Sequence, residues 1–351
     1  MLTIVNHHTA KRSEFPSWSP EFLNRINFNL GNSLISETLL KLIPGASLHD
    51  TLYGIENIPD PKKAALQLNN DYNKCIFVMQ DHVIYNSMPQ SNSIDAKKIL
   101  RCATFLESLR IPTLVVSLTV RKSLDSGIDD SHLIPESIEL LKSLRNPFVS
   151  VGTRGFATKN LLNEFGGIKV SAVGCPSFFV RKADTTREIN LEIIGTNGRF
   201  ANLPESSIHI AQGDDFGEPL LFKDIKGDGK IHVTKKLQKK MHKFYEPDFL
   251  DKLYFPASTM DWRVATKKLS LVGGTRLHGA ILALTLGIPV LTTASDVRAK
   301  ETLEFMNIPY VDQLTSQNFS KLAVESRSYF KEFDYKYHEK LQNFLSWLNA
   351  G

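Results

Sequence analysis

The chain alternates short apolar runs with longer segments in which apolar residues recur at helical spacing. Such runs, when bounded by turn residues, are typical of strands buried on both faces of a parallel sheet. The predicted strands are Cys75–Met79, Pro112–Leu118, Phe148–Val151, Val170–Val173, Ile189–Ile194, Ser207–Ala211, Leu269–Val272 and Pro289–Thr292. Helices are predicted within Phe28–Gly45, at Ala96–Leu109, Pro135–Leu144, Thr158–Phe165, Ser258–Lys267 and Gly279–Leu286, and from Asp296 onward. Strands that alternate with helices in this way predict an α/β fold with parallel sheets.

The length of 351 residues is more than one hydrophobic core usually serves and suits two domains. A charged segment with few apolar residues, Arg181–Arg187, is the predicted link. We therefore predict two Rossmann-like α/β domains, one over residues 1–181 and the other over residues 182–323. Residues 324–351 are predicted to form an amphipathic helix, because their aromatic residues recur at helical spacing.

The stretch Leu269–Asp296 reads as a strand, a turn, an almost wholly apolar helix and a second strand. A helix that is apolar on nearly every side must lie between a sheet and another element. Gly273 and Gly274 form the predicted turn, and Thr275-Arg276-Leu277-His278 follow where the helix begins. The first N–H groups of a helix have no partner within it and its dipole favours an anion, so this turn predicts an anion-binding site.

Other polar residues follow predicted strands or open the first helix, and ligands of α/β sheets bind outside the carboxyl ends of strands. Asp81 and His82 follow one strand and are either catalytic residues or parts of an ordinary turn. Arg154 follows another strand and precedes a helix, which indicates either a second anion site or a structural salt bridge. Gly31 and Asn32 open the first helix, as a loop that approaches a ligand or as a simple cap.

The net charge of +5 suits an acidic substrate or an anionic membrane surface, and it is too small to indicate nucleic acid. The lysine-rich run Lys223–Lys243 is either a solvated helix face or a contact for an anionic membrane or a diphosphate-linked substrate. No apolar run approaches the about 20 residues that span a bilayer, and the first residues do not resemble a signal peptide. We expect a cytoplasmic protein, and its association with a membrane surface stays open.

Two segments resemble motifs of the polysaccharide pyruvyl transferase family. The first is Gly274-Thr275-Arg276-Leu277-His278-Gly279, with Gly287-Ile288-Pro289, Asp296, Arg298 and Glu301 after it. The second is Arg154 with Leu161-Leu162, Gly166, Ile168 and Gly174-Cys175-Pro176-Ser177, and Gly31-Asn32 resembles the N-terminal loop of the family. Gln80-Asp81-His82 and Ser117-Leu118-Thr119 stand where many members of the family have glycines.

This resemblance implies two domains arranged as in GT-B glycosyltransferases, with the active site in the cleft between them. It implies transfer of pyruvate from phosphoenolpyruvate to two hydroxyls of a sugar in a polysaccharide or its precursor, forming a cyclic ketal and releasing phosphate. The donor is then a substrate, and neither a cofactor nor a metal ion is implied. The expected partners are phosphoenolpyruvate and a sugar acceptor, and a lipid-linked acceptor and a homo-oligomer stay open.

The resemblance also implies roles for single residues. Arg154 and Arg276 match donor-binding positions, and His278 matches the catalytic position, with Asp81 or His82 a candidate second acid or base. The other residues matched to substrate binding are Leu277, Thr275, Gly274, Gly31 and Asn32. Two alternatives remain at this point, a GT-B glycosyltransferase that uses nucleotide sugars and a non-catalytic relative that binds glycans.

Overall fold

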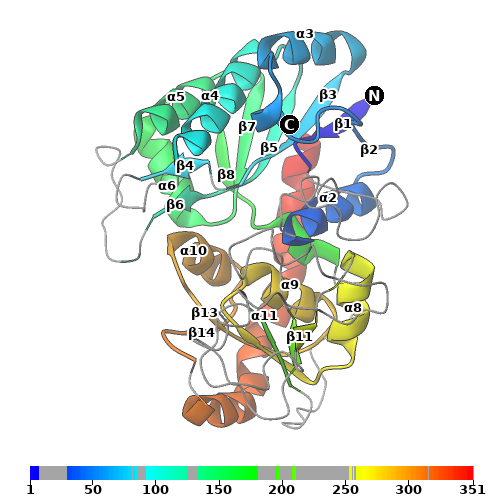
Figure 1. The fold of residues 1–351 in the computed structure, drawn as a ribbon, viewed down its shortest axis with the longest axis vertical. Helices are drawn as coiled ribbons and strands as arrows, with labels where there is room; N and C mark the ends of the chain where they lie inside the picture. Colours follow the sequence, from blue (N-terminus) through cyan, green and yellow to red (C-terminus); the bar gives the residue numbers. More distant parts are fainter. Residues whose placement is uncertain are drawn as a thin grey trace, which may run out of the picture.

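A computed structural model gives the arrangement of the chain. It describes residues 1–7, 30–80, 82–85, 92–122, 124, 133–180, 194–197, 208–210, 253–254, 256, 258–314 and 316–350. Two parallel sheets lie in two layered domains, one above the other in Figure 1, and the helices α2, α9 and α10 lie where the domains meet.

The first domain is built on a six-stranded parallel sheet in the order β2-β1-β3-β5-β7-β8. Its strands are β1 (Leu2–Val5), β2 (Ser47–Leu48), β3 (Lys74–Val78), β5 (Thr113–Leu118), β7 (Val149–Thr153) and β8 (Val170–Ala172). Two short strands, β4 (Val83–Ile84) and β6 (Val120–Arg121), pair with each other in a separate small sheet. The central strands β3, β5 and β7 are almost wholly buried, which explains why apolar runs and not alternating patterns marked them in the sequence.

Helices cover both faces of this sheet. They are α2 (Leu30–Leu42), α3 (Pro61–Asp71), α4 (Asn92–Ser108), α5 (Pro135–Ser143) and α6 (Phe156–Phe165), with the short 3-10 helices η2 (Ile55–Asn57) and η4 (Pro176–Val180). One face packs against α3, α4, α5 and α6. The other face packs against α2 and η4, and it is the face that continues into the second domain.

The second domain has a six-stranded parallel sheet in the order β11-β10-β9-β12-β13-β14. Its strands are β9 (Ile194–Asn197), β10 (Ile208–Ile210), β11 (Leu253–Tyr254), β12 (Leu271–Gly274), β13 (Val290–Thr293) and β14 (Tyr310–Val311). Its described helices are α8 (Thr259–Lys267), α9 (Leu277–Thr285), α10 (Val297–Phe305) and α11 (Ser316–Ala350). The side chains of Ser258 and Asp296 cap α8 and α10 by accepting hydrogen bonds from backbone N–H groups, which fixes where these helices begin.

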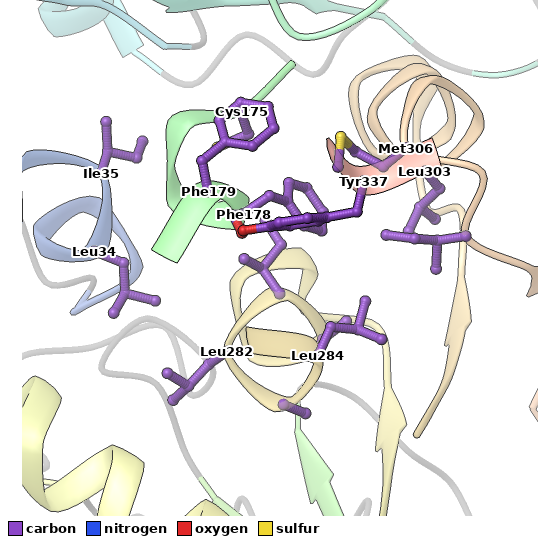
Figure 2. Packing of buried hydrophobic residues seen from close by; sticks show 14 of the residues in the cluster. Leu34, Ile35, Cys175, Phe178, Phe179, Leu282, Leu284, Leu303, Met306 and Tyr337 are labelled. Carbon is purple, nitrogen blue, oxygen red and sulfur yellow. The ribbon is translucent and has the colours of Figure 1, made fainter. Parts of the chain in front are cut away.

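One hydrophobic cluster joins the two domains. It contains Ile76 and Leu114 from the first sheet and Val272 and Val290 from the second. Figure 2 shows its centre, where η4 lies between α2, α9 and α11 and the aromatic rings of η4 fill the space between them. The Tyr337 hydroxyl of α11 donates to the Phe178 carbonyl at 3.0 Å, so its polar tip is satisfied inside this core. Because the core is continuous, the relative position of the two sheets is fixed by packing.

The predicted fold of two Rossmann-like α/β domains is confirmed, and the apolar helix α9 does lie between its own sheet and elements of the first domain. The sequence analysis missed β1 and α3, the short strands β2, β4, β6 and β11, and both described 3-10 helices. The predicted turn at Gly273 and Gly274 is wrong, because β12 continues through both glycines and the chain leaves the sheet only at Thr275. The proposed domain boundary after residue 181 and the lysine-rich run Lys223–Lys243 lie outside the described residues.

The C-terminal helix begins at Ser316, earlier than predicted, and runs the length of both domains (Figure 1). Its last turn docks on the first domain, where the Lys74 ammonium donates to the Leu348 carbonyl at 2.9 Å. The Trp347 ring lies against Gly152 of β7, where a Cβ would come within 2.7 Å of the ring. None of the described helices is both long and apolar enough to cross a membrane.

We expect Trp347→Ala to lower the free energy of unfolding by about 2–4 kcal/mol, because it removes a large ring from the contact between α11 and the first sheet. Chemical denaturation of the variant and the wild type measures this difference. The matched control is Tyr335→Ala on the same helix, whose side chain is 79% exposed and should change stability by less than about 0.5 kcal/mol. Equal effects of the two substitutions would contradict the docking role of Trp347.

Candidate active site between the two domains

Each sheet reverses its strand order at one point, and ligands of such sheets bind beside that point at the carboxyl ends of the strands. In the first sheet the reversal lies between β1 and β3, and in the second it lies between β9 and β12. Gln80 lies just beyond the end of β3, and Thr275 and Arg276 follow β12 directly. The topology therefore places Gln80, two residues before the predicted His82, and the predicted residues Thr275 and Arg276 at the edges where a ligand is expected.

Arg154 is a buried cation whose hydrogen-bond partners are neutral. Its side chain is 1% exposed, its Nε donates to the Ser117 hydroxyl at 2.7 Å and one terminal nitrogen donates to the Gln80 amide oxygen at 2.9 Å. An arginine has five N–H groups, so three are not committed to any described residue. No described carboxylate forms an ion pair with it, so the alternative of a structural salt bridge is not seen among these residues. A buried charge of this kind is stabilised by a bound anion.

His278 lies against the first domain. Its side chain is 7% exposed, and its ring packs so closely on Gly31 of α2 that a Cβ at Gly31 would come within 2.4 Å of Nδ1. Gly31 and Asn32 do not form the predicted loop, because α2 begins at Leu30 and both residues belong to its first turn. The glycine is needed here for close approach to the histidine, and the contact brings two predicted residues from different domains together.

Arg276 is the N-cap residue of α9, and its own side chain forms no capping hydrogen bond. The first turn of α9, which starts at Leu277, therefore offers backbone donors at the positive end of the helix dipole. Thr275, Arg276 and Leu277 are half-buried, and Leu277 packs on the shared core. Gly274 has φ 151°, and its carbonyl accepts a hydrogen bond from the Thr292 hydroxyl at 3.0 Å. This hydrogen bond ties the start of the turn to the neighbouring strand.

His209 on β10 is a further residue near Arg276 that the sequence analysis missed. It is fully buried and its Nδ1 lies 3.0 Å from the Thr196 hydroxyl. Burial, together with the positive charge of Arg276, lowers the pKa of His209 to about 3. The imidazole is therefore neutral at physiological pH and leaves the positive charge in this part of the site to Arg276.

Glu301 of α10 crosses from the second domain to the first. Its side chain is 3% exposed, and its two oxygens accept from the Thr158 backbone N–H at 2.8 Å and from the Thr158 hydroxyl at 2.5 Å. It thus caps α6, the helix that starts two residues after Arg154. Burial raises the pKa of Glu301 to about 7, although its hydrogen bonds to Thr158 and the charge of Arg154 oppose this shift. The backbone of Glu301 also packs on Gly155, where a Cβ would lie 2.6 Å from its carbonyl oxygen.

The remaining predicted residues are His82 and Asp81. His82 is half-buried, and its Nδ1 lies 3.3 Å from the Gln80 carbonyl, so it sits beside the group that contacts Arg154. Asp81 lies outside the described residues. The described site residues thus form one group around Arg154 and one around His278, and both groups lie where the domains meet. Within the described residues no set of three or more His, Cys, Asp or Glu side chains is placed to hold a metal ion.

Sequence reasoning did not identify Ser117, Thr158 or His209 as parts of the site. Ser117 and Thr158 are ordinary residues of a strand and a helix in the sequence, and only the fold brings them to Arg154 and Glu301. His209 follows the predicted pattern of a buried strand, in which a histidine is a weak signal. A buried polar residue inside an apolar run was the one signal that could have identified it.

The fold and the described contacts define an α/β protein of two Rossmann-like domains, with a buried arginine and a buried histidine where the domains meet. The model of the family described as polysaccharide pyruvyl transferase matches residues 29–296, a span that contains Gly31, Arg154, Arg276 and His278. The chain belongs to this family, whose activity is that of a transferase. No curated protein sequence matches the chain closely enough to count as a relative.

Two solved structures illustrate how distant the structural matches are. A UDP-N-acetylglucosamine 2-epimerase is similar at 10% sequence identity and a TM-score of 0.44, covering 95% of this chain and 89% of that one. MnaA of S. aureus, solved with UDP, is similar at 12% identity and a TM-score of 0.43, with the same coverage of 95% and 89%. At these values the likeness says nothing about what this chain binds.

We expect Gly31→Ala to lower the kcat of the transferase by about 100-fold, because the added methyl group would displace the His278 ring. Steady-state rates, with circular dichroism to confirm folding, measure this effect. Leu40→Ala on the exposed face of the same helix is the control and should leave kcat unchanged. A folded Gly31→Ala protein with the wild-type rate would show that the contact with His278 has no role.

Glu301 gives the protein a specific pH dependence of stability. The folded pKa of about 7 lies above the ordinary value of 4.5, so the folded state holds a proton that the unfolded state releases. Its contribution to stability is therefore fully present below about 4.5 and is lost as the pH rises to about 7. Relative to Glu301→Gln, the wild type should lose roughly 3 kcal/mol over this window.

Denaturation of both proteins at several pH values tests this difference, with Glu304→Gln on the exposed face of the same helix as the control. The stability difference between the wild type and the control should not change over the same window. If the free energy of unfolding changes with pH equally in the wild type and in Glu301→Gln, the carboxyl group of Glu301 does not titrate as described.

Proposed function

We propose that this protein transfers pyruvate from phosphoenolpyruvate to a sugar of a polysaccharide or its precursor, as a cyclic ketal, and releases phosphate. Membership of the polysaccharide pyruvyl transferase family supports this proposal. The observation on which it mainly rests is Arg154, a buried guanidinium with only neutral described partners at the contact between the domains. Such a group requires an anion, and the donor of this reaction is a small multiply charged anion.

Phosphoenolpyruvate carries a carboxylate and a phosphate on one carbon, so its site needs two separate places for negative charge. The uncommitted N–H groups of Arg154 suit one of these groups, because the planar guanidinium binds carboxylate or phosphate through two parallel hydrogen bonds. Arg276 and the backbone N–H groups in the first turn of α9 suit the other. On this proposal the donor bridges the two domains, and Gly274, Thr275 and Leu277 shape the turn that receives it.

The reaction forms two C–O bonds at the central carbon of the donor, the first by addition and the second by substitution of phosphate. One sugar hydroxyl adds to this carbon while the methylene carbon takes a proton and becomes a methyl group. The second hydroxyl then displaces phosphate, which leaves with the pair of electrons of its C–O bond, and the proton of that hydroxyl is released. Acid–base catalysis by one well-placed side chain contributes about 10²–10⁴-fold to steps of this kind.

His278 is the proposed acid and base of the reaction. Histidine both gives and takes protons near neutral pH, and this one lies at the start of α9, beside Arg276 and against Gly31. His82 beside Gln80 is the proposed second acid or base, with Asp81 as the alternative. The first turn of α2, with Gly31 and Asn32, lies next to His278 and is the proposed wall of the acceptor side.

Kinetics of two variants test this assignment. Arg154→Lys should raise the KM for phosphoenolpyruvate by about 10–100-fold, since lysine cannot bind an anion through two parallel hydrogen bonds. His278→Ala should lower kcat by about 10²–10⁴-fold with a smaller change in KM. Phosphate release in the presence of candidate sugar acceptors measures both parameters.

Two variants away from the site serve as controls. Arg145→Lys removes an exposed arginine that binds backbone carbonyls, and His338→Ala removes an exposed histidine of α11. Both should keep wild-type kinetics. An unchanged KM in Arg154→Lys would remove this arginine from the donor site. Stabilisation of the wild type by nucleotide sugars and not by phosphoenolpyruvate would instead indicate a glycosyltransferase.

A further inference from the structure

Ser117 sits in a β-bulge at the carboxyl end of β5. In the pairing of β5 with β7, Val116 lies opposite Gly152 and Leu118 lies opposite Thr153, so Ser117 is an extra residue without a partner position. The extra residue shifts the alternation of side chains, so the residues after it point to the opposite face of the sheet from the one that an unbroken strand would give. Val115 and Leu118, three positions apart, pack in the same hydrophobic cluster, which an unbroken strand would not allow.

The backbone of Ser117 is strained. Its φ is +73°, in the left-handed region that glycine adopts freely and that asparagine tolerates. The other described non-glycine residues with positive φ, Asn6 and Asn307, are both asparagines. Serine is therefore a costly choice here unless its hydroxyl has a role, because glycine would fit this conformation without strain.

The hydroxyl contacts the buried arginine directly. Arg154 Nε donates to Ser117 Oγ at 2.7 Å, and the Arg154 backbone N–H donates to the Leu118 carbonyl at 3.2 Å. Ser117 Oγ also lies 3.7 Å from the Cys175 sulfur, which in turn lies 3.0 Å from the Ser177 hydroxyl. The bulge thus directs the side chain toward the guanidinium, and Ser117 is fully buried there.

We propose that Ser117 is a positioning residue for the donor, whose strained bulge holds its hydroxyl as a fixed acceptor for Arg154 Nε. With Nε held by Ser117 and one terminal nitrogen held by Gln80, the plane of the guanidinium is set, and its remaining N–H groups are oriented before the donor arrives. A mobile guanidinium would have to be ordered during binding, which weakens affinity. This inference rests on the proposed function, because it concerns the same arginine and the same donor.

Two substitutions separate the hydroxyl from the strain. Ser117→Ala and Ser117→Gly both remove the hydroxyl, and only the glycine variant relieves the backbone. Both should raise the KM for phosphoenolpyruvate by about 10–100-fold with a smaller change in kcat. The melting temperature of Ser117→Gly should lie about 2–5 °C above that of Ser117→Ala. A residue with only a structural role would give the difference in melting temperature without the change in KM.

A double-mutant cycle tests whether Ser117 acts through Arg154. In an Arg154→Lys background, Ser117→Ala should change KM by less than about twofold, because the Nε donor is already absent. Ser143→Ala, which removes another buried serine hydroxyl, and Asn307→Gly, which alters another residue with positive φ, are the matched controls. Neither control should change KM.

The outcomes distinguish this inference from the proposed function. If the wild type releases phosphate from phosphoenolpyruvate and both Ser117 variants keep its KM, the positioning role is wrong and the function stands. The positioning role would also be wrong if Ser117→Ala raised KM by the same factor in the wild type and in the Arg154→Lys background. Ser117 would then act on the donor by a route that does not involve Arg154. If the wild type neither binds nor consumes phosphoenolpyruvate, the proposed function fails and the inference fails with it.

Discussion

The need to stabilise the buried charge of Arg154 is the constraint on which the rest of the site depends. A guanidinium that is 1% exposed loses most of its hydration, and among the described residues its hydrogen bonds go only to the neutral oxygens of Ser117 and Gln80. An ion pair with a carboxylate would stabilise the charge better but would occupy the N–H groups that an anionic substrate uses. On the proposed function, the bound donor supplies the remaining stabilisation of this charge.

The shared hydrophobic core keeps the two halves of the site in register. Residues of both sheets pack in one cluster around η4, and α11 runs along both domains (Figures 1 and 2). Polar contacts add precision where the site lies, because Glu301 of one domain caps a helix of the other and His278 packs on Gly31. A site made from two domains thus has fixed geometry without any single element that contains all of it.

The sequence predicted what local patterns encode and missed what distant contacts decide. Buried parallel strands and the apolar helix α9 were predicted because their apolar runs persist in the sequence. Arg154 and His278 were found because strand ends and helix starts are recognisable positions. The contact of Glu301 with Thr158 joins residues 143 positions apart, and no local pattern specifies it. The bulge at Ser117 was missed for a related reason, because a left-handed serine is set by its surroundings and not by its own preference.

A crystal structure of the protein with phosphoenolpyruvate tests the central claim most directly. The account predicts one donor molecule at the contact between the domains, with one anionic group bound by the Arg154 guanidinium and the other by Arg276 and the first N–H groups of α9. His278 should then lie within proton-transfer distance of the donor. A donor that binds to one domain alone, away from Arg154, would contradict the account.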